Sequence, residues 1–487
     1  MLQRVLDAAD SNFEGHVARL QRFIRQPSVS AEARGNDEMA AMLAAEIRKF
    51  GGTAEVVPGV DFPIVHGQID SGASRTVLIH SMYDTTPATE PSWVVPPFDA
   101  VRMDFENCGE CIVARGAEDT KGPVSAVFAM IDSYRRASVP LPVNLILLFE
   151  ASELGSASLP PFVRKYRDSL SRADVAYWPW HTQREDGTGV IWLGCKGIVT
   201  FKLRVNAGDW GGPTRAESHG LHSSWIANPS HRLIAALASL KTDGDLDVEI
   251  DGFYGAGDPV TIDDEELLTK LAQRLDPQVV LKEIGASRFK QDNFKDALRA
   301  HLFQSEFNVS GIQAGHVIEN GHKVVIPTEA VASLDLRPLD GMTVEKAMLA
   351  IRTHLDRRGF FEVKIELNHG YVGGRMPLDN WAVQELIGTY RDVGLDREIW
   401  PRTAAAIAVE LFTRDLGIPW IATCPGHSGR KHSANEFVQL SSYRTAVAFI
   451  CRLMWRLARA GGQKDNKSTR WVGPRGAAPN PLGNPHP

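Results

Sequence analysis

Thr76-Val-Leu-Ile-His80-Ser-Met-Tyr-Asp84 is a short apolar run that ends in ionisable residues. A second run, Val143-Asn-Leu-Ile-Leu-Leu-Phe149, has the same character and leads into Glu150-Ala-Ser-Glu153. Nearly continuous apolar runs of this length are typical of strands buried on both faces of a mostly parallel sheet. Ligands bind at the carboxyl ends of the strands in such sheets. Both runs therefore predict strands that deliver polar residues to one functional edge of an α/β domain.

Two further segments fit the same edge. Trp420-Ile-Ala-Thr-Cys424 is another buried run, and a glycine-containing loop connects it to His432-Ser-Ala-Asn-Glu436. Arg115-Gly-Ala-Glu-Asp119-Thr-Lys-Gly122 stands directly before an apolar helix that Pro123 suits at its first turn. We expect these four distant pieces of sequence to converge on one site.

The pattern of apolar and polar residues changes between residues 199 and 370. Segments with alternating apolar residues enclose helical segments, in the order strand, helix, strand, helix, strand. This pattern indicates a separate α+β layer with helices on one face of its sheet. We therefore predict a catalytic domain in two parts, 1–198 and 371–461, an inserted domain at 199–370, and a disordered tail at 462–487.

Composition excludes several classes of protein. The chain has 487 residues and a formal net charge of -6, so it lacks the basic footprint of a nucleic-acid or anionic-membrane binder. The first ten residues lack the apolar core of a secretory signal, and no window is long and apolar enough to span a bilayer, so we expect a cytoplasmic protein. Five cysteines do not favour a disulfide framework. The Cys108-Gly-Glu-Cys111 spacing is interpreted as a hairpin turn.

The four motifs, in this order, resemble the carnosinase, aminoacylase and succinyl-diaminopimelate desuccinylase superfamily of dinuclear zinc hydrolases, over about residues 15 to 460. The resemblance implies a three-layer zinc-aminopeptidase-like catalytic domain with an inserted ferredoxin-like lid. It also implies a homodimer formed through the lid and hydrolysis of an amide or peptide-like C–N bond in a small substrate.

The same resemblance assigns metal ligands. Asp119 matches the bridging aspartate, Glu153 a carboxylate ligand and His432 an imidazole ligand of one divalent ion, with zinc as the first choice. The two ligand positions of the other ion are occupied by Met82 and Trp180. We expect one ion per chain in preference to two, and a chain without any bound ion is the remaining alternative. Two histidines close to the lost positions, His80 and His181, are candidates to rebuild the second site.

The general base is displaced as well. Its position in the third motif falls on Ser152, which cannot accept a proton at neutral pH. Glu150 is one substitute and Glu153 is another, while Asp84 is a further acid–base candidate. The sequence leaves these choices open.

The lid and one late loop supply the remaining candidates. His219 stands next to the position of the family's oxyanion-stabilising histidine, and His222 follows three residues later. Asn308 and Arg337 are candidates to contact a substrate carboxylate, with a structural role as the alternative. Arg430 is a candidate to place positive charge near the vacated metal position, and a solvated loop is its alternative.

Three functional hypotheses follow. The first is a metal-dependent amide hydrolase, the second is metal-free chemistry on the same scaffold, and the third is an inactive paralogue that binds a ligand or pairs with an active relative. The metal-dependent hydrolase is favoured because one half of the metal site is intact.

Overall fold

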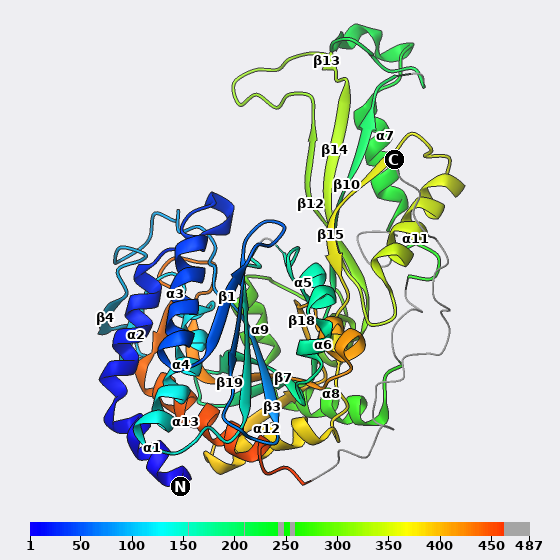
Figure 1. The fold of residues 1–487 in the computed structure, drawn as a ribbon. Coiled ribbons are helices and arrows are strands. Elements are labelled where there is room, and N and C mark those ends of the chain that lie inside the picture. The colour runs from blue at the N-terminus through cyan, green and yellow to red at the C-terminus, as the bar shows by residue number, and fades with distance from the viewer. Residues whose placement is uncertain (154, 209, 242–247, 254–258, 462–487) are drawn as a thin grey trace.

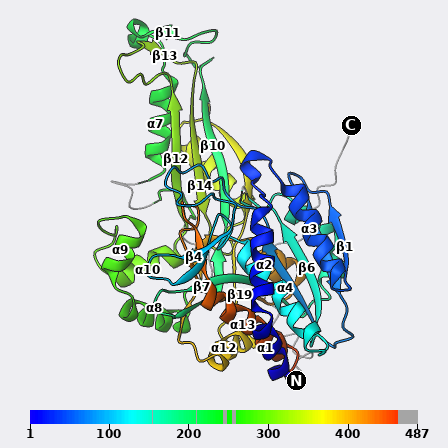
Figure 2. The same ribbon diagram turned by 90° about the vertical axis from the view of Figure 1, so that its left-hand side faces the viewer.

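The computed structural model describes residues 1–153, 155–208, 210–241, 248–253 and 259–461. The predicted tail at 462–487 lies outside these residues. In the described part, a large base carries an elongated lid that stands on one of its edges (Figures 1 and 2).

One mixed sheet forms the centre of the base. Its strands β3, β6, β7 and β19 run parallel to one another, and antiparallel strands extend the sheet on both sides. The spatial order is β1 (Thr53–Val57), β2 (Ile64–Ile69), β6 (Asn144–Glu150), β3 (Thr76–Met82), β7 (Val175–Gln183), β19 (Trp420–Gly429), β20 (Phe437–Gln439), β5 (Glu110–Val113) and β4 (Val101–Asp104). Two more strands, β8 (Gly189–Trp192) and β17 (Arg397–Trp400), pair beside β7.

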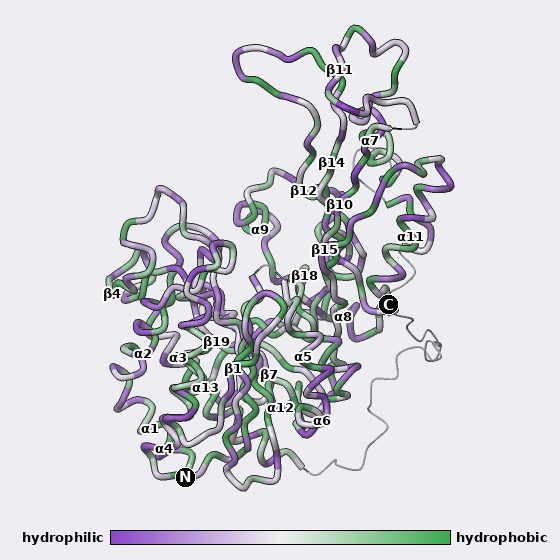
Figure 3. The backbone as a smooth tube through the Cα atoms, turned by 45° about the horizontal axis from the view of Figure 1, so that its top comes forward, coloured by the Kyte–Doolittle hydropathy of each residue, from purple (hydrophilic) through white to green (hydrophobic). Residues whose placement is uncertain are grey.

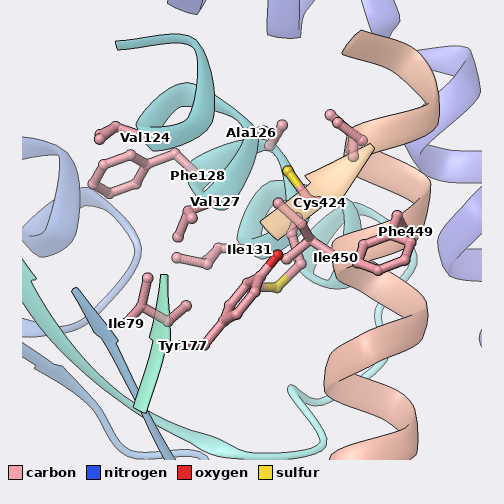
Figure 4. Packing of buried hydrophobic residues seen from close by; sticks show 14 of the residues in the cluster. Ile79, Val124, Ala126, Val127, Phe128, Ile131, Tyr177, Cys424, Phe449 and Ile450 are labelled. Carbon is pink, nitrogen blue, oxygen red and sulfur yellow. The ribbon is translucent and has the colours of Figure 1, made fainter. Parts of the chain in front are cut away.

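Helices cover both faces of this sheet because its strands are apolar on both sides. Alternate residues of β3 contribute to different cores: Val77 and Ile79 pack on one face, and Leu78 packs on the other. The first face is covered by α1 (Leu2–Ser11), α2 (Phe13–Arg25), α3 (Asn36–Lys49), α4 (Lys121–Arg136), α12 (Trp381–Asp392) and α13 (Leu440–Leu457). Figure 4 shows Ile79 and Tyr177 of this face together with Phe128 of α4 and Ile450 of α13.

The second face is covered by shorter helices, namely α5 (Leu159–Lys165), α6 (Arg167–Leu170) and the π-helical turn η4 (Leu411–Leu416). Figure 3 shows hydrophobic stretches along the central strands and hydrophilic stretches on peripheral elements such as α6 and α11. The predicted three-layer α/β base is confirmed.

The lid is a four-stranded antiparallel sheet with helices on one face. Its strand order is β12 (Glu306–Ala314), β14 (Glu329–Arg337), β10 (Ile198–Asn206) and β15 (Lys364–Tyr371). The helices α7 (Pro229–Ser239) and α11 (Val344–Arg357) pack against these strands. At the far tip, β11 (Ser218–His219) pairs with β13 (Val325–Ile326), next to the short helix η2 (Gly220–Ser224). The predicted ferredoxin-like lid is confirmed.

Three helices within the inserted span lie near the base: α8 (Ile262–Arg274), α9 (Pro277–Ile284) and α10 (Phe294–Phe303). Arg274 of α8 forms ion pairs with Asp396 and Glu398, and Asp264 pairs with Arg375. A small sheet of β16 (Gly374–Arg375), β9 (Gly194–Lys196) and β18 (Thr403–Ala406) lies at the junction. The inserted span therefore also builds part of the base.

The Cys108–Cys111 segment lies at the β4–β5 hairpin, as interpreted from the sequence, and all five cysteines are free. Among the described residues, no helix combines the length and the hydropathy that crossing a membrane requires.

Candidate active site

A cavity of about 500 Å³ lies where the lid meets the carboxyl ends of the base strands. Met82, Glu150 and Trp180 line it from β3, β6 and β7. Thr200 of β10 and Tyr371 of β15 line it from the lid. The cavity is therefore built by both domains, at the edge that the apolar strands predict.

Asp119, Glu153 and His432 come together at this cavity. They follow β5, β6 and β19, respectively, and each offers one ligand atom within 4.8 Å of the others. The Nε2 atom of His432 lies 3.0 Å from Oδ2 of Asp119 and 3.5 Å from Oε2 of Glu153. Among the described residues, this is the one group of three or more metal-ligating side chains with such spacing.

Both carboxylates of this group are buried, and each has one oxygen without a hydrogen-bond partner. Oδ1 of Asp119 and Oε1 of Glu153 are buried and have no hydrogen-bond partner. Burial and then the neighbouring charge of Asp119 raise the pKa of Glu153 well above its usual value. Two carboxylates and an imidazole form a ligand set that zinc accepts, with a further position left open. A divalent cation therefore fits these residues, since it would satisfy both unpartnered oxygens.

A buried ion pair holds the loop that carries Asp119. Glu436 is fully buried, and its Oε1 accepts hydrogen bonds from the backbone N–H groups of Gly116, Glu118 and Asp119 at 2.8–3.0 Å. Its other oxygen lies 2.9 Å from the Arg115 guanidinium. Both residues stand within the sequence motifs, but their residue types alone did not indicate this supporting role. Together they fix the backbone on which the aspartate stands.

Asp84 holds the loop that carries Glu153. Its carboxylate accepts hydrogen bonds from the backbone N–H groups of Ser152, at 2.9 Å, and of Glu153, at 3.1 Å, and from the Ser30 hydroxyl. Burial raises the pKa of Asp84 to about 6, although these hydrogen bonds act in the opposite direction. Asp84 does not line the cavity, so its geometry is that of a positioning residue. Ser152 does line it.

Comparison with known proteins agrees with this geometry. A profile of Peptidase family M20/M25/M40 matches residues 78–456. The chain belongs to this peptidase family. It is therefore a hydrolase of C–N bonds, and the predicted family resemblance and enzyme class are confirmed.

Family relatives span nearly the whole chain. The Cys-Gly metallodipeptidase DUG1 of Candida albicans is 26% identical, over 91% of this chain and 94% of its own. The human Beta-Ala-His dipeptidase is also 26% identical, over 93% of both chains. Among solved structures, the M20 family metallo-carboxypeptidase Sso-CP2 of Sulfolobus solfataricus has a TM-score of 0.83 at 27% identity, covering 91% of this chain and 99% of its own. Human carnosine dipeptidase 1, at 21% identity and a TM-score of 0.75 over 94% and 100% of the two chains, shares the fold.

The two histidines predicted to rebuild a second metal site lie apart from the three-ligand group. His80 is buried, and its Nε2 lies 2.8 Å from Oε1 of Glu150, which also accepts a hydrogen bond from Ser156. His181 is buried with both ring nitrogens unpartnered, and it lines a neighbouring cavity instead. Burial lowers the pKa of His181 to about 3. Successive residues of a strand point to opposite faces, so Trp180 faces the site and His181 does not.

The predicted substrate-binding residues are also spread over the molecule. Arg337 lines the cavity, with its Nε 3.3 Å from an Asp335 oxygen. Asn308 is exposed on β12 and donates to the same carboxylate group at 3.1 Å. Arg430 pairs with Glu106 and lies over the Phe105 ring, outside the cavity lining.

His219 belongs to β11 and His222 to the adjoining η2, and Figure 2 shows β11 at the lid tip, far from the base of the same chain. The sequence reasoning also missed several cavity-lining residues. Trp178, Thr200, His369, Tyr371 and Ile407 all line the cavity. The alternation of β10 and β15 signals which residues share a face, but only the docking of lid on base shows that this face meets the site.

Proposed function

We propose that this chain is a metal-dependent hydrolase that cleaves the amide bond of a small, dipeptide-like substrate with one divalent ion per chain, most simply zinc. The observation that carries the proposal is the convergence of Asp119, Glu153 and His432 on the cavity between lid and base. The two buried, unpartnered carboxylate oxygens in this group support a bound cation.

These three residues would hold the ion. When bound, the ion would supply an acidified water and would polarise the amide carbonyl. Glu436 and Asp84 keep the two carboxylate loops in place through backbone hydrogen bonds. Such supporting contacts maintain ligand orientation before any substrate arrives.

We assign the proton-accepting role to Glu150. Glu150 lines the cavity, and its Oε2 has no hydrogen-bond partner. Its Oε1 lies 2.8 Å from His80, so the imidazole can share a proton that the carboxylate takes up. Ser152, at the family's base position, lacks a group that accepts protons at neutral pH.

A dipeptide-like substrate agrees with the relatives and with the cavity. Two of the similar proteins named above are dipeptidases, one for Cys-Gly and one for Beta-Ala-His. Arg337 offers a cation on the lid side of the cavity and would bind a substrate carboxylate. We place the protein in the cytoplasm, where reducing conditions suit its five free cysteines.

The proposal includes a homodimer that forms through the lid. His219 ends β11, and η2, which contains His222, follows it directly at the end of the lid that points away from the base, so these histidines would not serve the site of their own chain (Figure 2). Leu221 and Trp225 beside them are 64% and 75% exposed, which leaves an apolar surface at the tip. In a dimer, this surface would bring His219 to the partner's cavity.

Two matched glutamine variants test the assignment of roles. Glu150→Gln should keep one ion per chain and lower kcat by about 10²–10⁴-fold, because it removes proton transfer alone. Glu153→Gln should lose the ion, because it removes a ligand. Metal analysis of the purified variants and steady-state kinetics on dipeptides measure both effects.

Glu14→Gln is the control, since Glu14 is a surface residue that pairs with Arg102. It should match the wild type in both measurements. Full metal content in Glu153→Gln would contradict the ligand assignment, and full activity in Glu150→Gln would remove Glu150 from the mechanism.

A further inference from the structure

An aromatic and apolar wall adjoins the three-ligand group. β3 and β7 pair in parallel with Ile79 opposite Tyr177, and both of these residues face the α4 side, which Figure 4 shows. The next residues of each strand face the other way. His80, Met82, Trp178 and Trp180 accordingly all line the cavity.

This wall cannot hold a second ion by itself. An indole N–H is a donor only, and a thioether is a soft, weak ligand for zinc. The remaining polar residue of the wall, His80, is bonded to Glu150. Within the described residues, the metal-ligating group at this cavity has three members, and no residue of the wall belongs to it.

The wall has instead the features of a ring-binding subsite. The Trp178 and Trp180 ring centroids lie 4.6 Å apart at 75°, an edge-to-face pair, and Met82 lines the same cavity and packs against the hydrophobic cluster that contains both rings. Ile198, Tyr371 and Ile407 extend the apolar lining. Aromatic rings pack favourably against tryptophan faces and against methionine sulfur.

A second observation also points to a ligand. Trp178 and Trp180 are only 4% and 9% exposed, and neither indole N–H has a hydrogen-bond partner. Buried tryptophan N–H groups usually find an acceptor. An amide or carboxylate oxygen carried beside a bound ring would supply it.

We propose that Met82, Trp178 and Trp180 form a subsite for an aromatic side chain next to the scissile amide, in the space beside the single metal position. The inference rests on the proposed amide hydrolysis for its substrate class. Such a subsite makes the enzyme selective for dipeptides that contain phenylalanine or a similar residue.

Hydrolysis and product binding test the subsite separately. We expect kcat/KM for glycyl-phenylalanine or phenylalanyl-glycine to exceed that of the matching alanine dipeptide by at least about tenfold, because a phenyl ring becomes buried. Calorimetry with L-phenylalanine and L-alanine should show the same preference in binding. Trp180→Ala should reduce both ratios to within about twofold, whereas Trp180→Phe should retain most of the preference.

Trp455→Ala is the matched control, because Trp455 lies on α13, outside the cavity lining. It should leave both ratios unchanged. A wild-type protein with equal binding of phenylalanine and alanine, or with a preference that survives Trp180→Ala, overturns the inference. If phenylalanine binds selectively through Trp180 but no dipeptide is cleaved, the subsite stands and the proposed hydrolysis fails.

Metal content gives an independent readout. The wild type and Trp180→Ala should each bind one ion per chain, and Met82→His combined with Trp180→Asp should bind two and lose the aromatic preference. Two ions in the wild type would overturn the inference, since the second ion would occupy the space assigned to the ring.

Discussion

The acidic residues around the cavity differ mainly in their partners. Asp84 and Glu436 have carboxylates that accept several backbone N–H groups, so these two residues position loops. Asp119 and Glu153 each retain a buried oxygen without a partner, which suits a cation. Residue type and spacing alone could not separate these roles, because all four are acidic residues at the ends of apolar strands or in the loops that follow them.

His181 gives a prediction at the residue scale. Burial disfavours the charged ring and lowers the pKa of His181 from its usual 6.5 to about 3 in the folded protein. As the pH falls below 6.5, His181 becomes protonated in the unfolded chain but stays neutral in the folded chain. The free energy of unfolding therefore decreases. At pH 5 this residue should lower the free energy of unfolding by about 2 kcal/mol relative to pH 8.

Urea unfolding of the metal-free protein at both pH values measures this loss. Because phenylalanine does not titrate, the free energy of unfolding of His181→Phe should fall by about 2 kcal/mol less than that of the wild type between pH 8 and pH 5. Some loss should remain in the variant, because burial also lowers the pKa of His16. An identical pH dependence in variant and wild type would show that His181 is not buried as a neutral ring.

Among elements, the lid combines a well-packed sheet with an exposed tip. Alternating residues of β10 and β14 build the lid core. At the tip, Leu221, Trp225 and Val324 are more than half exposed. The sheet strands were predictable from their alternation. The helices α8 to α10, and the ion pairs that α8 forms with the base, had no sequence signal that linked them to a distant segment.

The exposed tip gives a prediction for this element. Trp225→Asp should shift the protein from dimer to monomer, because it places a charge in the apolar interface that we propose. Sedimentation velocity at micromolar protein concentration measures the change. Val60→Asp, in an exposed loop of the base, is the control and should remain dimeric. A wild type that sediments as a monomer would refute the lid-mediated dimer.

For the whole molecule, the sequence predicted the layers better than the site. Apolar runs and alternating strands indicated an α/β base with an inserted α+β domain, because both patterns are local, and the family resemblance implied the three-layer arrangement. Cavity residues such as His369 and Trp178 could not be placed, because their neighbours come from strands far apart in the chain. His80 and His181 were candidates because they lie near the lost ligand positions, but His80 contacts Glu150 within the cavity lining, and strand alternation turns His181 toward a neighbouring cavity.

The central claim is a single divalent ion held by Asp119, Glu153 and His432. The most direct measurement is a calorimetric titration of the metal-free protein with zinc. Elemental analysis of the dialysed complex then counts the bound ions. We predict one tightly bound ion per chain in the wild type and none in Asp119→Asn. Two tight ions in the wild type, or one ion retained in full by Asp119→Asn, would contradict the account.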